Sequence, residues 1–196
     1  MKKFGNNKNF AFLLLFALCF ICWFLNTCVY HHMTHMNKEE VNWAANRKQG
    51  ETWYFESSDG VVDTAEIREV VIFNSLNPIN WAYFNTSSKA YLASATVYYS
   101  LRNGGGVLCI MKEKAQEPIR FSSVLSDGNW QKDVLLNVTS LRINDTILND
   151  VMHFENENSK DSIPANSIRS YSWSQRYGLV QYTLQDGSVF NRIGVE

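Results

Sequence analysis

The stretch Ala90 to Arg102 (AYLASATVYYSLR) decides the fold of this chain. Apolar side chains occupy every second position from Tyr91 to Leu101, and serine and threonine fill most of the positions between them. This period-two alternation is typical of a strand with one face buried in an antiparallel sheet. The glycines that follow, in Asn103 to Gly106, allow a chain reversal, so we expect Val107 to Met111 to return as the neighbouring strand.

Two Asp-Gly dipeptides mark further hairpins. Asp59-Gly60 separates the β-prone runs Trp53–Ser57 and Val61–Thr64, and Asp186-Gly187 follows the run Leu179–Leu184. Asp-Gly between β-prone runs is a strong hairpin signal because both residues tolerate positive φ.

Two details of side-chain direction follow from the same periodicity. The alternation changes phase near Arg68-Glu69, which predicts a bulge or bend at that point. Val180, Tyr182 and Leu184 are expected to share one face of their strand. No apolar period of a helix is found after about residue 50.

These patterns predict an all-β body with about eight to eleven strands. We expect a curved antiparallel meander that forms an open barrel or sandwich, preceded by an N-terminal apolar helix. The expected organisation is a signal peptide or membrane anchor over 1–28, a polar tether over 29–49 and an antiparallel β domain over 50–196. A short helix is expected within the tether, over Asn37–Arg47.

The N-terminus has the pattern of a targeting segment. Lysines at 2, 3 and 8 precede an uninterrupted apolar run over residues 10–25. The run is longer than most signal-peptide cores and shorter than a typical spanning helix. With basic residues on its N-terminal side only, it predicts a body on the non-cytoplasmic side of a membrane.

The residues Leu25-Asn26-Thr27-Cys28 resemble a bacterial lipobox, which directs lipid attachment to the cysteine. Leu25 fits that pattern, whereas Asn26 and Thr27 depart from it. Three alternatives follow: acylation of Cys28, an uncleaved helical anchor, and simple secretion. The expected partner is therefore a membrane, contacted through acylated Cys28 or through residues 10–25.

The net charge and the cysteine content of the body argue against some classes of function. Residues after 27 hold 15 of the 18 Lys+Arg and all 19 Asp+Glu, a net charge of about −4. A field of that sign repels polyphosphate and argues against a nucleic-acid partner. Three of the four cysteines lie at positions 19, 22 and 28, which leaves Cys109 alone in the body, where we expect it to be a small buried hydrophobe.

No catalytic motif of the common hydrolase, metalloprotease or nucleotide-binding kinds is present. The segment His31–Met36 (HHMTHM) has metal-binding side chains, but no second cluster completes a shell, so neither a metal site nor another cofactor is predicted. An envelope hydrolase would be supported by two carboxylates, or by His153 and Asp150, that converge in a cleft. We therefore expect no enzyme activity.

A surplus of aromatic residues remains in the body. Such side chains fill a core or line an apolar ligand site. The candidates for a ligand-binding face are Trp53, Tyr99, Trp130, Trp173 and Tyr182.

The segment Tyr171–Tyr182 (YSWSQRYGLVQY), followed by Asp186-Gly187, resembles the closing segment of small envelope lipoproteins common in Bacteroidota. In that family an aromatic strand runs into a Tyr-Gly-Leu/Ile-Val/Ile-Lys turn and a last Asp-Gly hairpin, and Asn149–Val151 fits the same arrangement. More distantly, the segment is similar to periplasmic carriers of the lipoprotein-localisation type, whose curved sheet holds acyl chains in its concave face. The resemblance implies an envelope location and a β architecture, and brings no activity with it.

The sequence therefore predicts a non-catalytic cell-envelope lipoprotein that binds a hydrophobic ligand or a partner protein on a curved sheet. The alternative is a structural or assembly subunit that acts through an exposed sheet edge.

Overall fold

The computed structural model describes residues 7–29, 34–74, 93–102, 104–124, 130–156 and 164–195, and within these ranges it describes the side chains except at 7–10, 24–29 and 130–133. The elements are α1 (Asn7–Val29), α2 (Lys38–Ala45), β1 (Thr52–Ser57), β2 (Val62–Phe73), β3 (Ala93–Leu101), β4 (Gly104–Lys112), β5 (Arg120–Val124), β6 (Trp130–Leu135), β7 (Thr139–Ile143), β8 (Thr146–Glu155), β9 (Ile168–Ser174), β10 (Gly178–Leu184) and β11 (Val189–Arg192).

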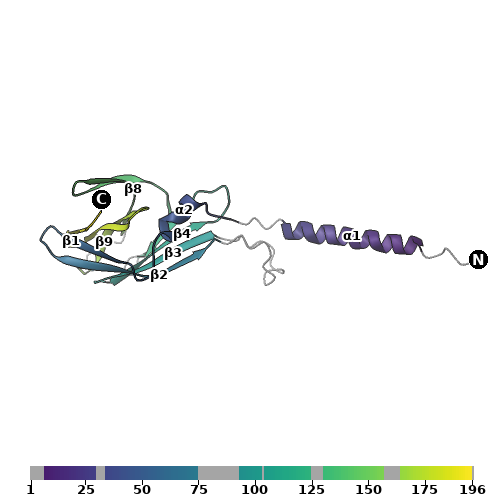
Figure 1. The fold of residues 1–196 in the computed structure, drawn as a ribbon, viewed down its shortest axis with the longest axis horizontal. Helices are drawn as coiled ribbons and strands as arrows, with labels where there is room; N and C mark the ends of the chain where they lie inside the picture. Colours follow the sequence, from purple (N-terminus) through teal and green to yellow (C-terminus); the bar gives the residue numbers. More distant parts are fainter. Residues whose placement is uncertain are drawn as a thin grey trace, which may run out of the picture.

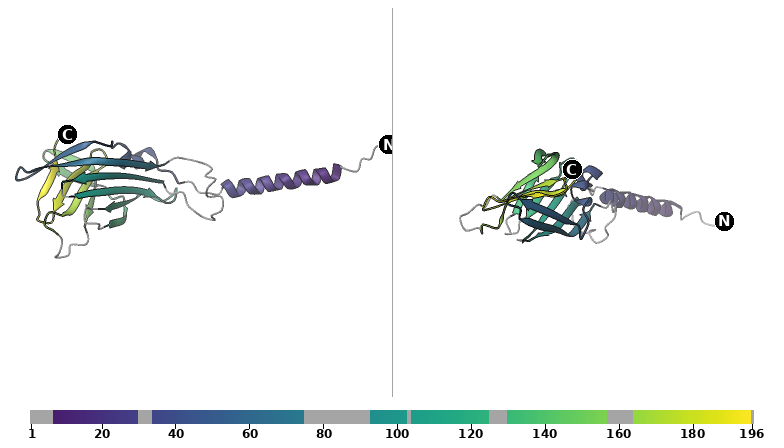
Figure 2. Two further views of the ribbon diagram at one scale, coloured as in Figure 1. Left: turned by 90° about the horizontal axis from the view of Figure 1, so that it is seen from below. Right: turned by 60° about the vertical axis from the view of Figure 1, so that its left-hand side comes forward.

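All eleven strands belong to one antiparallel sheet in the order β6-β5-β4-β3-β2-β1-β11-β10-β9-β8-β7. The sheet curls on itself into a half-barrel, with α1 standing apart from it (Figure 1; Figure 2). The predicted curved antiparallel meander is therefore confirmed. Pairing between β1 and β11 joins the first and last strands of the body, with Phe55 opposite Arg192.

The two edge strands, β6 and β7, are consecutive in the chain and separated by three residues, 136–138. Every pairing along the sheet is antiparallel, and ten of them lead from β6 to β7, so these two strands point the same way. The run 130–143 therefore continues in one direction, pairing first with β5 and then with β8. This shared run brings the two edges of the sheet together.

The glycines at 104–106 lie within a strand, which corrects the expected loop. β4 begins at Gly104, and Gly106 lies opposite Tyr99 of β3. A Cβ atom built on Gly106 would come within 2.3 Å of the Tyr99 ring. The glycine is therefore needed because the buried ring of Tyr99 crosses over the backbone of β4.

Two of the register shifts in the sheet bear on side-chain directions expected from the sequence. The pairing of β2 with β3 shifts between Ile67 and Glu69, as predicted. A second shift, between Leu179 and Gln181, was not expected. It reverses the facing of Val180, so the prediction that Val180 shares a face with Tyr182 was wrong.

The reversed Val180 packs in a small second core. Its buried partners are Ile143, Leu148 and Val151, from the β7–β8 hairpin. Met152 follows Val151 but packs in the main core, so the two residues face opposite sides of β8. The hairpin turns at Asn144, which has a positive φ of 53°.

The predicted N-terminal helix is present as α1, and the described side chains, Ala11 to Trp23, are all exposed. They include Phe12, which is 73% exposed, and Phe16, which is 68% exposed. In the part of the chain that the structure describes, no helix combines the length and the apolarity that crossing a membrane requires.

The tether expected over 29–49 needs a correction, because its residues from 34 onward pack against the body. The predicted short helix is confirmed as α2, and it begins with a capping box between Asn37 and Glu40. Trp43 and Ala44 of this helix are buried in the main core. The sequence did not indicate these two buried residues, because the stretch is mostly polar.

We predict that Gly106→Ala lowers the free energy of unfolding by about 1–3 kcal/mol, because the new methyl group overpacks the buried Tyr99 ring. Urea unfolding followed by circular dichroism measures the change. Cys109→Ala is the matched control on the same strand, since Cys109 is only partly buried and faces away from the main core. Equal effects of the two substitutions would contradict this account of Gly106.

Candidate functional site

The concave side of the half-barrel brings together four of the five predicted ligand-face residues. Trp53, Tyr99, Trp173 and Tyr182 are each at most 3% exposed and belong to one core cluster. Trp173 packs on Trp53 at 5.8 Å and on Tyr99 at 5.9 Å between ring centroids. The fifth, Trp130, lies in β6, and its side chain is outside the described residues.

Further rings complete this aromatic interior. Phe154 of β8 stacks on Tyr171 of β9 with centroids 4.9 Å apart, and Tyr182 stacks on Phe190 at 4.8 Å. Phe154 and Phe190 were not among the predicted site residues. The sequence feature that could have identified them is their period-two alternation in strands next to the aromatic strands.

Hydroxyl groups lie inside the aromatic interior at two points. Tyr171 shares a short hydrogen bond with Ser123 of β5, and the Tyr99 hydroxyl is buried without a hydrogen-bond partner among the described residues. Tyr182 donates to Asp63 Oδ2 at 2.5 Å. Asp63 lies in β2 and is buried. The interior is apolar with a few polar groups, which is the composition of a site for an amphipathic ligand.

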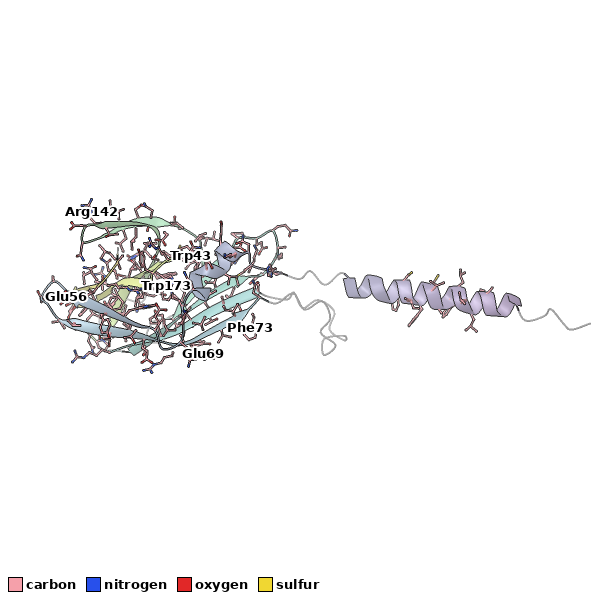
Figure 3. All side chains as sticks on the ribbon, in the orientation of Figure 1. Trp43, Glu56, Glu69, Phe73, Arg142 and Trp173 are labelled. Carbon is pink, nitrogen blue, oxygen red and sulfur yellow. The ribbon has the colours of Figure 1, made fainter. Side chains whose placement is uncertain are left out.

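Helix α2 covers the aromatic interior. The Trp43 ring packs edge-on against Phe121 of β5 at 5.3 Å between centroids. Its backbone carbonyl accepts a hydrogen bond from Trp173 Nε1 at 3.1 Å. Figure 3 shows Trp43 and Trp173 lying together within the curl of the sheet. The cover therefore contacts both the β2–β5 wall and the β8–β10 wall.

Polar contacts hold α2 on the β4 wall. Glu40 forms an ion pair with Lys112 Nζ of β4 at 2.7 Å, and both side chains are largely buried. Glu40 also accepts from the backbone N–H of Asn37, which closes the capping box. One carboxylate thus fixes both the helix start and its contact with the sheet.

The C-terminal end of α2 is tied to the β9–β10 turn. Asn46 Nδ2 and Arg47 Nη2 both donate to the carbonyl of Gln175, at 3.0 and 2.9 Å. Gln175 Nε2 in turn donates to the carbonyl of Glu39 at 2.7 Å. These bonds are solvent-exposed or partly buried, so water can replace them at this end of α2.

Two arginines flank the edge of the interior at Trp53. The guanidinium carbons of Arg47 and Arg192 lie 5.9 and 4.7 Å from the Trp53 ring centroid. Burial, opposed by Glu51 and assisted by the charge of Arg192, lowers the pKa of Arg47 to about 10. The cation–π contacts and Glu51 compensate for this crowding of positive charge.

Asp150 and His153, the pair considered for a hydrolase, have different hydrogen-bond partners. Asp150 accepts from Ser174 Oγ and from the Arg176 backbone N–H, at 2.9 and 2.8 Å. His153 contacts Ser172 Oγ at 3.1 Å and Glu155 Oε1 at 3.4 Å. Ser172 is only 2% exposed.

A polar cleft of about 270 Å³ lies at another part of the body. Its walls include Glu56 of β1, Asn191 and Arg192 of β11, and Asn144 of the β7–β8 turn. None of the predicted ligand-face residues lines it. Glu56 and Phe73 lie at opposite ends of the body in Figure 3, so the cleft is remote from the end that is nearest to α1.

The segment His31–Met36 is only partly described, since 31–33 lie outside the described residues. Met36 is fully buried, and its sulfur is used in the core. Within the described ranges, no group of three or more His, Cys, Asp or Glu side chains is placed to hold a metal ion.

No family model, curated protein or solved structure matches this chain. Its function is therefore inferred from the aromatic interior, the α2 cover and the exposed apolar side chains of α1.

We predict that the protein loses stability as pH rises above about 10. Burial raises the pKa of the Tyr99, Tyr171 and Tyr182 hydroxyls, whereas unfolded tyrosine ionises near pH 10. Above that pH the unfolded state binds fewer protons, so the free energy of unfolding falls. Arg47, with a pKa of about 10, acts in the opposite sense and is outweighed by three tyrosines.

Urea unfolding at about pH 8 and about pH 11 tests this dependence, and near-ultraviolet absorbance of tyrosinate shows when the hydroxyls ionise. Tyr171→Phe should flatten the slope. Ionisation of all tyrosines before unfolding would contradict the burial of these three.

Proposed function

We propose that this protein is a non-catalytic cell-envelope lipoprotein whose curled sheet binds a hydrophobic ligand. The observation that carries the proposal is the aromatic interior with its few hydroxyl groups, covered by the short helix α2. The N-terminal segment holds the body at the non-cytoplasmic face of a membrane.

The exposed side chains of α1 support the membrane location. Large apolar residues from Phe12 to Trp23 are each more than half exposed. Leaving them in water is unfavourable by roughly 25 cal/mol for each Å² of apolar surface. A lipid phase removes that surface from water, and acylation of Cys28 adds a second membrane signal.

The ligand enters only when α2 moves. The aromatic rings are at most 7% exposed while Trp43 lies among them, so a ligand reaches them by displacing this ring. The polar contacts of α2 with Gln175 can exchange with water, whereas the largely buried Glu40–Lys112 pair must separate for α2 to leave the sheet. A hydrophobic ligand with a single acyl chain makes apolar contacts in place of those that Trp43 loses.

We predict that Cys28→Ser abolishes incorporation of radioactive palmitate when the full chain is expressed in a bacterium. The serine hydroxyl does not replace the thiol that the lipid-transfer reaction needs. Cys22→Ser is the matched control, because Ile21 before it excludes it as a cleavage site. If the wild type carries no label and the variant stays in the membrane fraction at unchanged mobility, acylation is refuted and the uncleaved helix is the anchor.

We predict that Trp43→Ala increases labelling of the interior by a photoreactive fatty acid added to membranes that contain the full chain. The backbone bond from Trp173 is kept, so the variant removes only the ring that covers the site. Each 1.4 kcal/mol of packing lost by the covered state raises the open population about tenfold. Mass spectrometry of the labelled peptides locates the fatty acid, and we expect it on β9 and β10.

Tyr54→Ala is the control for that experiment, because Tyr54 is an exposed aromatic residue of β1. It should leave the labelling unchanged. Labelling that is confined to the outer face, or that is absent from both the wild type and the Trp43→Ala variant, would refute the ligand site.

A second candidate function is a structural subunit that binds partner proteins through a sheet edge. The edge strands β6 and β7 each pair on one side only. Between and beside them, Leu135, Leu136 and Val138 are 56, 41 and 44% exposed. A stoichiometric protein co-purifying with the full chain, together with the absence of fatty-acid labelling, would favour this function.

A further inference from the structure

The end of the half-barrel that receives the chain from α1 is fixed by three hydrogen bonds. Thr34 Oγ1 donates to the carbonyl of Glu113, just after β4, at 2.8 Å. The backbone of Met36 makes two bonds with the Asn74 side chain, just after β2, at 2.8 and 2.9 Å. The rim where β2 and β4 end is therefore the part of the body nearest to α1 along the chain.

This rim carries exposed apolar side chains on both faces of β2. Phe73 is 66% exposed and lies opposite Ser94, whereas Ile72 is 43% exposed and lies opposite the buried Ala95. Ile67, farther from the rim on the same strand, is fully buried. Figure 3 shows Phe73 at the end of the body that faces α1. We call Ile72 and Phe73 the apolar rim.

Two lysines among the described residues next to the apolar rim have carboxylate partners. Lys112 is bound by Glu40 at 2.7 Å, and Lys114 by Glu117 at 2.6 Å. These carboxylates, together with the exposed Glu113, weaken the attraction of this end of the body to an anionic partner. A partner of the rim must be recognised by its apolar character.

The length of the connection identifies the partner. Five residue steps separate Val29, the end of α1, from Thr34, and they span at most about 18 Å. If Cys28 or α1 is held in a membrane, the rim lies within that distance of the lipid. An aromatic side chain at that depth is favoured in the interfacial region of a bilayer.

We propose that the apolar rim, Ile72 and Phe73, rests on the lipid surface that holds the N-terminal segment, with Phe73 inserted among the headgroups. The inference rests on the proposed membrane anchoring. This contact gives the body a defined orientation on the membrane. The rim next to the start of α2 faces the lipid, and the polar cleft near Glu56 faces away from it.

The test is photo-crosslinking of the full chain in phosphatidylcholine vesicles. Benzoylphenylalanine replaces Phe73 in one protein and Tyr54 in the control. Tyr54 lies opposite Thr64, nine residues along β2 from Phe73 and so about 30 Å away. We expect at least about tenfold more phospholipid crosslinked at 73 than at 54, and the same result in about 1 M salt because the contact is apolar.

Flotation of the vesicles separates the two proposals. A chain that does not float with the vesicles refutes the anchoring on which the inference rests. A chain that floats but crosslinks lipid equally at both positions, or only protein at 73, refutes the apolar rim and leaves the anchoring intact. Loss of lipid crosslinking at 73 in high salt would also overturn the apolar contact proposed here.

Discussion

The packing of aromatic rings across the curled sheet is the interaction on which the rest of the structure depends. Trp173 and Tyr171 of one wall meet Tyr99 of the other, and Tyr99 lies across the bare backbone of Gly106. Rings of this size bury large apolar areas and pack edge-on. They fix the distance between the two walls of the sheet, and that distance determines where α2 can pack. Fold, cover and candidate ligand site are therefore consequences of one set of contacts.

The main features of the fold could be predicted from the sequence because local chemistry controls them. Gly60 and Gly187 of the two Asp-Gly dipeptides adopt the positive φ that their turns need, and the phase change at Arg68-Glu69 appears as a register shift. The second shift, before Gln181, could not be read from periodicity, because Leu179 and Val180 are both apolar. The glycines of β4 were misread for a related reason. From a single sequence, a glycine required by a turn cannot be distinguished from a glycine required because an aromatic ring packs against its backbone.

The candidate site was predicted in part. Four of the five named aromatic residues pack in one cluster, but whether Trp53 and Trp173 line a cavity or fill a core depends on what lies between the walls. That segment is α2, which was expected to be part of a tether. Its signal was present: Asn37 and Glu40 have the spacing of a capping box, and Trp43 follows three residues later. Asp63 was missed because its partner, Tyr182, lies 119 residues away in the sequence.

The pairing of β1 with β11 has a consequence for how the chain is made. Phe55 and Arg192 are 137 residues apart in the sequence, and contacts of such long sequence separation form slowly. Until they pair, β1 has an unpaired edge, and the rings of Trp53 and Phe55 lack their partners Trp173 on β9 and Tyr182 on β10. Unpaired strand edges and exposed apolar rings favour aggregation during folding. The folding chain must therefore keep β1 from pairing with other chains until β11 is in place.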